Sequence, residues 1–268
     1  MEKKIIKANY TPLWPTPFGW ANLGEDYREL NKRLVDDMET ERALDDSGKG
    51  GTFRNNNLGW QSKNGMEKRY SSFAELAPAI SAVAKAVMGK SGIKSDEGSN
   101  VKNLWANMIL GQGGYSFPHT HGNGDTLWSG VYYPKGLEDI EDLDELDIPK
   151  HFQHQTMKGG GKLIIRDSNI AKQLVKAKNP SGGKEPYNRN FSVNPRESLL
   201  VLFPDWVEHM VTPTENDEKR YSISFGIFRK SDIISNGPET RTAEKMGWVT
   251  SDSHDDTIKD DVTVIKKE

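Results

Sequence analysis

The sequence contains no cysteine among its 268 residues. Disulfide bonds, thiolate nucleophiles and zinc–thiolate sites are therefore excluded. Long hydrophobic runs are also missing, since hydrophobic residues make up 34% of the chain and no segment approaches the roughly 18 apolar residues that span a bilayer. A formal net charge of −3 gives no electrostatic reason to expect nucleic acid or an anionic membrane as a partner. With an N-terminus that has no apolar signal-peptide core, these absences predict a soluble, cytoplasmic protein.

Short β-prone runs dominate the chain from residue 101 onward, and glycine, proline and aspartate separate them. Because no helical pattern lies between these runs, they predict an antiparallel double-sheet roll rather than a parallel sheet. Before residue 100, apolar residues recur at helical spacing in segments 26–46 and 72–92, with a glycine- and asparagine-rich loop at 47–60. We therefore expect a mainly β fold of the α+β class, with two helices packed on one outer face of the sheet.

The pattern predicts a single domain over residues 1–232, in which 1–100 supply an edge segment and the supporting helices and 101–232 form the core. Between Gly136 and Pro149 there are seven acidic residues and no basic one. Such a charge run is typical of a solvated surface, so we expect an acidic insertion over 136–157. Residues 233–268 are polar and irregular, which predicts a loosely packed C-terminal tail.

Two histidines one residue apart, His119 and His121, stand in the segment SFPHTHGNGD. On an extended strand, residues i and i+2 point to the same face, so one strand can present both imidazoles to a single ion. A third histidine, His209, follows a predicted strand in VLFPDWVEHMV. Neutral imidazole is the commonest metal ligand, and the three side chains together predict a metal site. The remaining histidines are expected to be exposed and inert: His151, His154 and His254.

An arginine and a serine begin the next strand, KRYSISFGIF, as Arg220 and Ser222. The planar guanidinium of arginine suits bidentate pairing with a carboxylate, and a serine two residues on lies on the same strand face. A metal site beside such a cation predicts an enzyme that binds an organic acid on a metal. The residues that flank this region and are candidates for lining the pocket are Trp105, Asn107, Trp128, Tyr132 and Tyr133.

The order of these motifs resembles the 2-oxoglutarate and Fe(II)-dependent oxygenases, whose double-stranded β-helix core carries His-x-Asp/Glu, then a distal His, then Arg-x-Ser. More narrowly, residues 105–136 and 197–225 look like an oxygenase subfamily of phages and marine bacteria. That subfamily has Trp-x-Asn, then His-x-His, then Ser-Gly-Val-Tyr-Tyr, then Phe-Pro before the distal His. The resemblance covers about residues 101–228.

This resemblance implies a jelly-roll, cupin-like core that uses Fe(II) as cofactor and 2-oxoglutarate as co-substrate. It implies that His119 and His209 bind iron and that Arg220 and Ser222 bind the distal carboxylate of 2-oxoglutarate. Asn107, which shares a strand face with Trp105, is a candidate hydrogen-bond donor to the co-substrate or substrate. The implied reaction is hydroxylation of a C–H bond with release of succinate and CO₂, and no side chain acts as a nucleophile.

The sequence departs from the family where it has His121 in place of the carboxylate ligand. Three imidazoles leave a divalent ion at a formal charge of +2, whereas a carboxylate ligand lowers that charge to +1. Asp125 lies four residues beyond His121 and completes the site instead if the turn at 122–124 folds back. The two ligand sets, three histidines or Asp125 with His209 and either His119 or His121, both remain open.

Two other functions fit the same residues. One is a cupin-like dioxygenase or isomerase that uses three histidines and no 2-oxoglutarate, and the other is a non-catalytic β-roll that binds a ligand. Arg220 and Ser222 favour the oxygenase, because a generic cupin has no need of a buried cation at that point. The substrate, a small molecule or a peptide, is not indicated by the sequence.

Overall fold

The computed structural model describes residues 16–45, 56–91, 100–121, 126–137, 160–166 and 190–228, and two short paired strands, β12 (Trp248–Val249) and β13 (Ile265–Lys266). Most of the predicted acidic insertion and nearly all of the predicted tail lie outside the described residues. Among the described helices, none is long and apolar enough to cross a membrane.

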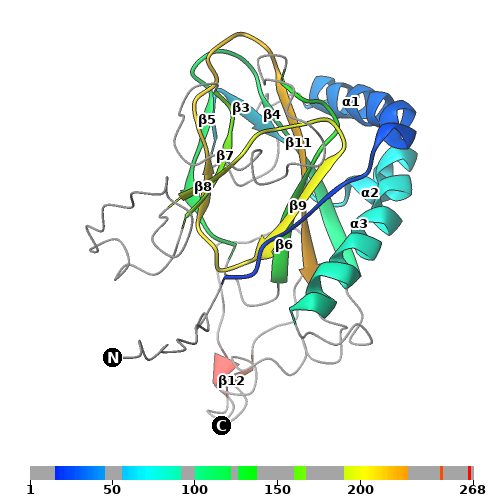
Figure 1. Cartoon of the computed structure of the whole chain (residues 1–268), viewed down its shortest axis with the longest axis vertical. Coiled ribbons are helices and arrows are strands. Elements are labelled where there is room, and N and C mark those ends of the chain that lie inside the picture. The colour runs from blue at the N-terminus through cyan, green and yellow to red at the C-terminus, as the bar shows by residue number, and fades with distance from the viewer. Residues whose placement is uncertain are drawn as a thin grey trace, which may run out of the picture.

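Two antiparallel β-sheets face each other across the body of the protein (Figure 1). The large sheet has the strand order β1 (Gly19–Asn22), β9 (Leu199–Pro204), β6 (Thr126–Tyr133), β11 (Arg220–Phe228), β4 (Asn100–Ile109) and β3 (Gly59–Gln61). The small sheet has the order β2 (Asn56–Asn57), β5 (Tyr115–His119), β10 (His209–Val211), β7 (Leu163–Arg166) and β8 (Asn190–Val193). This arrangement is the double-stranded β-helix that the sequence predicts.

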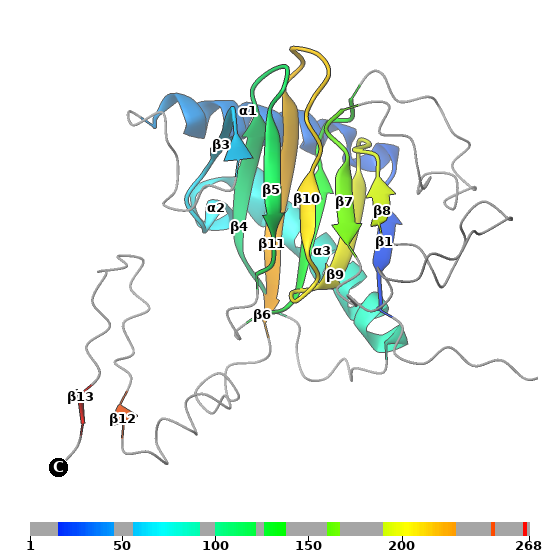
Figure 2. The ribbon, with the colours of Figure 1, turned by 90° about the vertical axis from the view of Figure 1, so that its left-hand side faces the viewer.

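The two sheets lie one behind the other, with β5, β10, β7 and β8 in front of the large sheet in the view of Figure 2. The predicted loop at 47–60 is wrong in its second half, because β2 joins the small sheet and β3 the large one. A single residue, Leu58, separates these strands with a φ of 49°. Its carbonyl accepts a hydrogen bond from the Leu110 backbone N–H. The chain therefore passes from the small sheet to the large sheet at a single residue with a left-handed backbone conformation.

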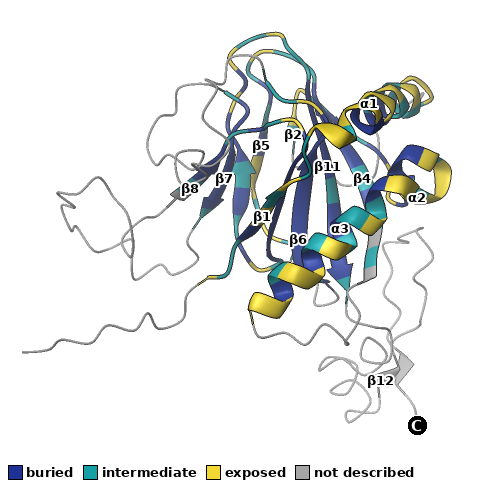
Figure 3. Cartoon of the chain, turned by 45° about the vertical axis from the view of Figure 1, so that its right-hand side comes forward, coloured by how far each residue is buried: buried dark blue, intermediate teal, exposed yellow. Residues whose placement is uncertain are grey.

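Two long helices, α1 (Arg28–Ala43) and α3 (Ser71–Lys90), cover the outer face of the large sheet, as expected. A short 3₁₀ turn, η1 (Glu25–Tyr27), precedes α1, and a four-residue helix, α2 (Met66–Arg69), precedes α3. Figure 3 shows the buried side of each helix turned toward the strands and the exposed side turned outward. Apolar residues from the helices pack with the helix-facing residues of β4, β6 and β11 in one core.

A second, smaller core lies between the two sheets. Its members come mainly from β6, β7, β8 and β9, and they are Val131, Tyr133, Leu163, Ile165, Val193, Leu199, Val201, Phe203 and Val207. The inner faces of β4, β5 and β10 contribute no residue to this cluster. This apolar packing joins the two sheets on the side formed by β6, β7, β8 and β9.

The packing of the helices against the large sheet predicts which substitutions in α1 lower the stability of the protein. Leu34 in α1 is fully buried, so Leu34→Ala should lower the free energy of unfolding by about 2 to 5 kcal/mol through lost transfer energy and a residual cavity. The measurement is urea denaturation followed by circular dichroism. Leu44→Ala is the matched control, because Leu44 is 70% exposed at the end of the same helix and should change stability by less than about 0.5 kcal/mol. Equal losses for both variants would mean that α1 does not pack as described.

Candidate metal centre

The pairing of β5 with β10 places two of the candidate ligands opposite each other. His119, the last residue of β5, is the register partner of His209, the first residue of β10. Two positions later on β10, Val211 pairs with Ser116, which lies three positions before His119. The strand β5 therefore holds one residue more than β10 in this interval, which is the pattern of a β-bulge.

The extra residue belongs to the pair Phe117–Pro118, which lies opposite Met210. Proline is tolerated there because a bulge does not need every backbone N–H for the ladder. The Phe117 side chain is 49% exposed, whereas Ser116 is buried, so the bulge turns Phe117 outward. By shifting the alternation of side chains by one residue, the bulge directs both Ser116 and His119 to the inner face.

His121 does not lie on the strand, because β5 ends at His119. The backbone N–H of His121 donates to the carbonyl of Asp205, in the turn that joins β9 to β10. The ring of Trp105 meets the His121 ring edge to face, with 5.9 Å between centroids. The third imidazole is thus held by the turn before β10 and by β4, and not by the strand alternation on which its prediction depended.

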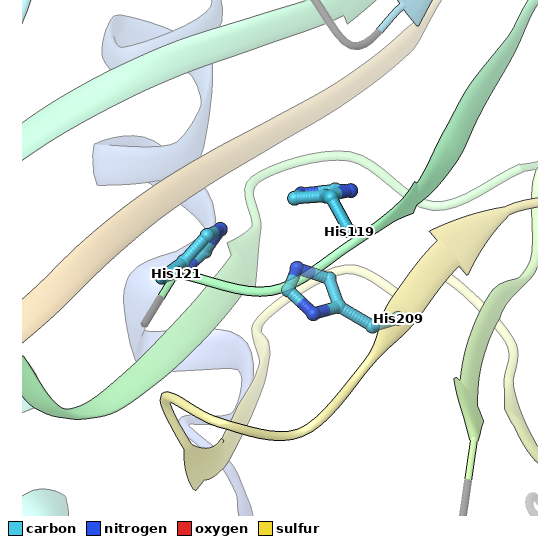
Figure 4. Close-up of side chains that lie close together, drawn as sticks. All are labelled: His119, His121 and His209. Atoms are coloured by element: carbon cyan, nitrogen blue, oxygen red, sulfur yellow. The ribbon is translucent and has the colours of Figure 1, made fainter. Parts of the chain in front are cut away.

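The three imidazoles converge as Figure 4 shows. Ring centroids lie 4.2 Å apart for His119 and His209, 4.8 Å for His121 and His209, and 5.3 Å for His119 and His121. One nitrogen from each ring lies within 4.8 Å of the corresponding nitrogens of the others, a spacing that a single ion can bridge. Within the described part of the chain, this is the only cluster of three or more metal-ligating side chains.

Each ring already uses its Nδ1 atom for a contact with the protein. Nδ1 of His119 lies 2.7 Å from the Phe117 carbonyl, and Nδ1 of His209 lies 3.0 Å from the Val207 carbonyl. Because a carbonyl only accepts, both Nδ1 atoms carry the proton, and both Nε2 atoms have a free lone pair. Such contacts from outside the ligand set orient metal-binding histidines and raise their basicity.

Burial keeps the three rings neutral. It lowers the pKa of His119 and lowers the pKa of His121 to about 4, with repulsion from His119 adding to the second shift. The pKa of His209 lies well below its usual value, first because of burial and then because of the other two histidines. Neutral imidazole is the form that binds a metal, so these rings need not release a proton near neutral pH before they do so.

A buried cation lies on the inner face of β11. The Arg220 side chain donates from Nε to the Gly161 carbonyl at 2.8 Å, from Nη1 to the Ser222 hydroxyl at 2.9 Å, and from Nη2 to the Tyr133 hydroxyl at 3.3 Å. Its guanidinium carbon lies 5.2 Å from the centre of the Tyr133 ring. Arg220 is only 3% exposed, and no acidic side chain pairs with it in the described ranges.

None of these three partners carries a negative charge. Burial raises the pKa of Tyr133, so its hydroxyl stays protonated, and a carbonyl and a serine hydroxyl are neutral. Burial also lowers the pKa of Arg220, but a guanidinium stays charged at physiological pH. A desolvated charge of this kind is costly unless an opposite charge joins it. The arrangement is suited to receive the carboxylate of a ligand.

Two of the flanking candidates lie on β4 beside this face. Asn107 is the register partner of Ser222, and Trp105 is the register partner of Ser224. The Asn107 amide donates to the Ser224 hydroxyl at 2.9 Å, and both Asn107 and Trp105 are partly exposed. Trp105 therefore contacts the candidate metal centre through His121. Asn107 lies two positions further along β4, on the same strand face and nearer to Arg220.

The other aromatic candidates lie on opposite faces of β6, because side chains alternate along a strand. Tyr133 faces the space between the sheets and contacts Arg220, whereas Trp128 and Tyr132 belong to the core against the helices. The Tyr132 hydroxyl donates to the side chain of Asn31 in α1. Because neighbouring positions on a strand point to opposite faces, Trp128 and Tyr132 lie on the far side of the sheet from the histidines, and the expectation that they line the pocket is corrected.

The same alternation identifies a residue that the sequence analysis missed. Ser129 stands on β6 with Val131 and Tyr133 on the inner face, and its hydroxyl lies 2.7 Å from Nδ1 of His121. The alternation within the motif Ser-Gly-Val-Tyr-Tyr would have placed it there once Tyr133 was known to face inward. Asp125, the alternative ligand, and the histidines at 151, 154 and 254 lie outside the described residues.

Comparison with known proteins connects this geometry to a family. Residues 103–226 match the family model described as "Putative 2OG-Fe(II) oxygenase". This segment begins on β4 and ends on β11, so it contains all three histidines, Arg220 and Ser222. No curated protein matches the sequence significantly.

Several solved structures share the fold. A prolyl-4-hydroxylase from Pseudomonas putida is 13% identical, with a TM-score of 0.50 over 80% of this chain and 94% of that one. A prolyl hydroxylase from Trichoplax adhaerens, solved with a hypoxia-inducible-factor peptide, is 14% identical, with a TM-score of 0.50 over 81% and 86%. The α-ketoglutarate-dependent epimerase SnoN of nogalamycin biosynthesis is 12% identical, with a TM-score of 0.52 over 80% and 77%. At these identities the likeness shows the fold alone.

The converging imidazoles predict a divalent-metal site that depends on His209, the most buried of the three. In titrations with Co(II), followed by its visible ligand-field bands, the wild type should bind one ion and His209→Ala should bind none. His154→Ala is the matched control, since His154 is predicted to be inert, and it should bind like the wild type. Undiminished binding by His209→Ala would place the metal elsewhere.

Proposed function

We propose that this chain, whose core belongs to the 2-oxoglutarate- and Fe(II)-dependent oxygenases, is a hydroxylase that converts a C–H bond of its substrate to an alcohol. The balanced reaction takes up the substrate, O₂ and 2-oxoglutarate, and it yields the hydroxylated product, succinate and CO₂. The observation that carries this proposal is a buried arginine with no acidic partner among the described residues, on a sheet face shared with residues that contact the cluster of three imidazoles.

The residues present fit both iron and the co-substrate. Imidazole nitrogen suits Fe(II) as well as zinc, copper and nickel, and three protein ligands leave the remaining positions of an ion open. When bound, Fe(II) and 2-oxoglutarate supply the oxidative decarboxylation that activates O₂ for attack on the substrate. His119, His121 and His209 would hold the ion, each through Nε2, since each Nδ1 is already engaged.

The chain's own residues orient the co-substrate. Arg220 would pair with the distal carboxylate of 2-oxoglutarate through the guanidinium edge left after its bond to Gly161. Ser222 and Tyr133 fix that guanidinium, and their hydroxyls can also donate to the incoming carboxylate. Asn107, in the same row on β4, would donate to the co-substrate or to the substrate.

Apolar rings next to the histidines exclude water from the reacting atoms. The Phe203 ring lies 4.8 Å from the His209 ring, and Trp105 borders His121. Excluding water strengthens electrostatic interactions inside the site and suppresses side reactions of the oxidant. Trp105 is partly exposed, so it stands at the boundary between the centre and the side from which a substrate would enter.

A cupin-like enzyme without 2-oxoglutarate is the second candidate, and one observation favours it: no carboxylate belongs to the metal-ligating cluster in the described residues. Asp125 lies outside those residues, so the alternative set with Asp125 stays a prediction. Arg220 weighs against this candidate, because an enzyme that binds no organic dianion has no use for a desolvated cation there.

Further expectations remain proposals. The motif order supports placing the chain in the subfamily of phages and marine bacteria, and the absence of cysteine supports a cytoplasmic location. A single domain over 1–232 is supported by the common core that joins the N-terminal helices to the sheet. A solvated acidic insertion over 136–157 is supported by the seven acidic residues between Gly136 and Pro149. The substrate would be a small molecule or a peptide, and nothing in the charge supports nucleic acid as a partner.

The direct test of the reaction class is an anaerobic titration of the Fe(II)-loaded protein with 2-oxoglutarate. Chelation by 2-oxoglutarate should produce a visible metal-to-ligand charge-transfer band, and admission of O₂ with a panel of amino acids, peptides, nucleobases and lipids should identify the substrate by succinate release. Bound Fe(II) without that band would favour the cupin-like candidate. Failure to bind any divalent metal would favour a non-catalytic β-roll.

Arg220→Ala should separate the two binding events. Metal affinity should stay as in the wild type, whereas 2-oxoglutarate should bind roughly 30-fold more weakly or worse, because truncating one partner of a buried charge pair costs about 2 to 5 kcal/mol. The measurement is the same charge-transfer titration.

The matched control for this variant is Arg33→Ala, which removes an exposed arginine that pairs with Glu75 on the helical side of the protein. It should leave both metal and 2-oxoglutarate affinities unchanged. Equal 2-oxoglutarate affinity in Arg220→Ala and wild type would remove Arg220 from the co-substrate site.

A further inference from the structure

We infer that Ser129 is the positioning residue for His121, and that it makes a histidine competent as metal ligand at the position where the wider group of 2-oxoglutarate and Fe(II)-dependent oxygenases has a carboxylate; this inference rests on the proposed function. Nδ1 of His121 lies 2.7 Å from the Ser129 hydroxyl, which comes from β6 in the large sheet. Ser129 is 1% exposed, so water does not compete for this contact.

His121 differs from the other two ligands in how its ring is oriented. His119 and His209 each contact the backbone carbonyl two residues before them, a partner that no substitution removes. His121 lies two residues beyond the end of β5, so strand geometry does not fix its side chain. Its only described hydrogen-bond partner through the ring is a side chain.

The contact also bears on the tautomer. A neutral imidazole carries its proton on one nitrogen only, and the nitrogen without the proton is the one that binds a metal. A serine hydroxyl can donate or accept, and binding of an ion through Nε2 requires the tautomer in which the Ser129 oxygen accepts from Nδ1–H of His121. Without an acceptor at Nδ1, the ring is free to rotate or to exchange tautomers, and part of the population presents N–H to the metal instead.

A carboxylate ligand would need no such partner, because both of its oxygens are unprotonated and either can bind. The replacement of a carboxylate by His121 therefore creates a requirement that the hydroxyl of Ser129 meets. Trp105 adds to this from the other side, since its ring restricts rotation of the imidazole by an edge-to-face contact. Of these two contacts with His121, the one made by Ser129 depends on a single hydroxyl oxygen, which a Ser129→Ala substitution removes.

The test is a double-mutant cycle read out by metal affinity and not by turnover. In Co(II) titrations, Ser129→Ala should bind about 10- to 100-fold more weakly than the wild type, the usual effect of removing a partner of a metal-bound histidine. In a His121→Ala background, adding Ser129→Ala should change the affinity no further, because the hydroxyl acts only through that ring. The control is Ser72→Ala, which removes a buried hydroxyl that donates to Asp37 on the helical side and should leave the affinity unchanged.

Two outcomes would overturn the inference. One is an unchanged affinity in Ser129→Ala, and the other is the same loss in both backgrounds, which would mean a general structural effect. A second measurement needs no variant: long-range ¹H–¹⁵N spectra of the Zn(II)-loaded wild type should show the proton of His121 on Nδ1, and a proton on Nε2 would also overturn it. If His209→Ala still binds metal, the proposed function fails; if only the Ser129 experiments fail, the function stands and the positioning role does not.

Discussion

The pairing of β5 with β10 is the constraint on which the rest of the site depends, because it brings His119 opposite His209. The bulge at Phe117–Pro118 decides which way His119 points. Three positions separate Ser116 from His119, so the strict alternation of a regular strand would put them on opposite faces, and one of them would face solvent. A local irregularity in the small sheet thus determines whether two imidazoles meet.

The large sheet supplies a different component. Its inner face carries Ser129, Trp105 and Arg220, while its outer face is fixed against α1 and α3 by the helix-to-sheet core. Rigid packing on one side and polar groups on the other is how a β-scaffold holds ligands within narrow limits. Burial has two effects here. It lowers the pKa of the imidazoles and so keeps them neutral, and it removes water from a guanidinium that has no described counter-ion. Both effects prepare the centre for a cation and for an organic anion that bridges the two.

Much of this could be predicted from the sequence. Helical spacing located α1 and α3, and the change to short β-prone runs after residue 100 predicted the antiparallel double-sheet roll. The histidine cluster was predicted from the His-x-His motif, although the stated reason was incomplete: β5 ends at His119, and His121 reaches the cluster through the turn at Asp205. The relative position of two segments about 85 residues apart is a tertiary fact that strand periodicity does not contain.

Other features could not be predicted for the same reason. A bulge is defined by the pairing with the partner strand, which the sequence of one strand does not contain. Alternation shows that Tyr132 and Tyr133 face opposite sides of the sheet, but which of them faces inward follows only when the direction of one residue on the strand is known. Strands β2 and β3 were missed because two or three residues rich in asparagine and glycine have low intrinsic β-propensity, and their pairing with β5 and β4 is tertiary. Arg220 was predicted to be a cation near the metal, but the three neutral groups that surround its guanidinium are visible only in the folded arrangement.

The most direct test of the central claim is an anomalous-scattering map of crystals grown anaerobically with Fe(II) and 2-oxoglutarate. Our account predicts one iron peak about 2.1 Å from Nε2 of His119, His121 and His209, with the distal carboxylate of 2-oxoglutarate on Arg220. An iron peak that contacts fewer than three of these rings, or 2-oxoglutarate bound away from Arg220, would contradict it.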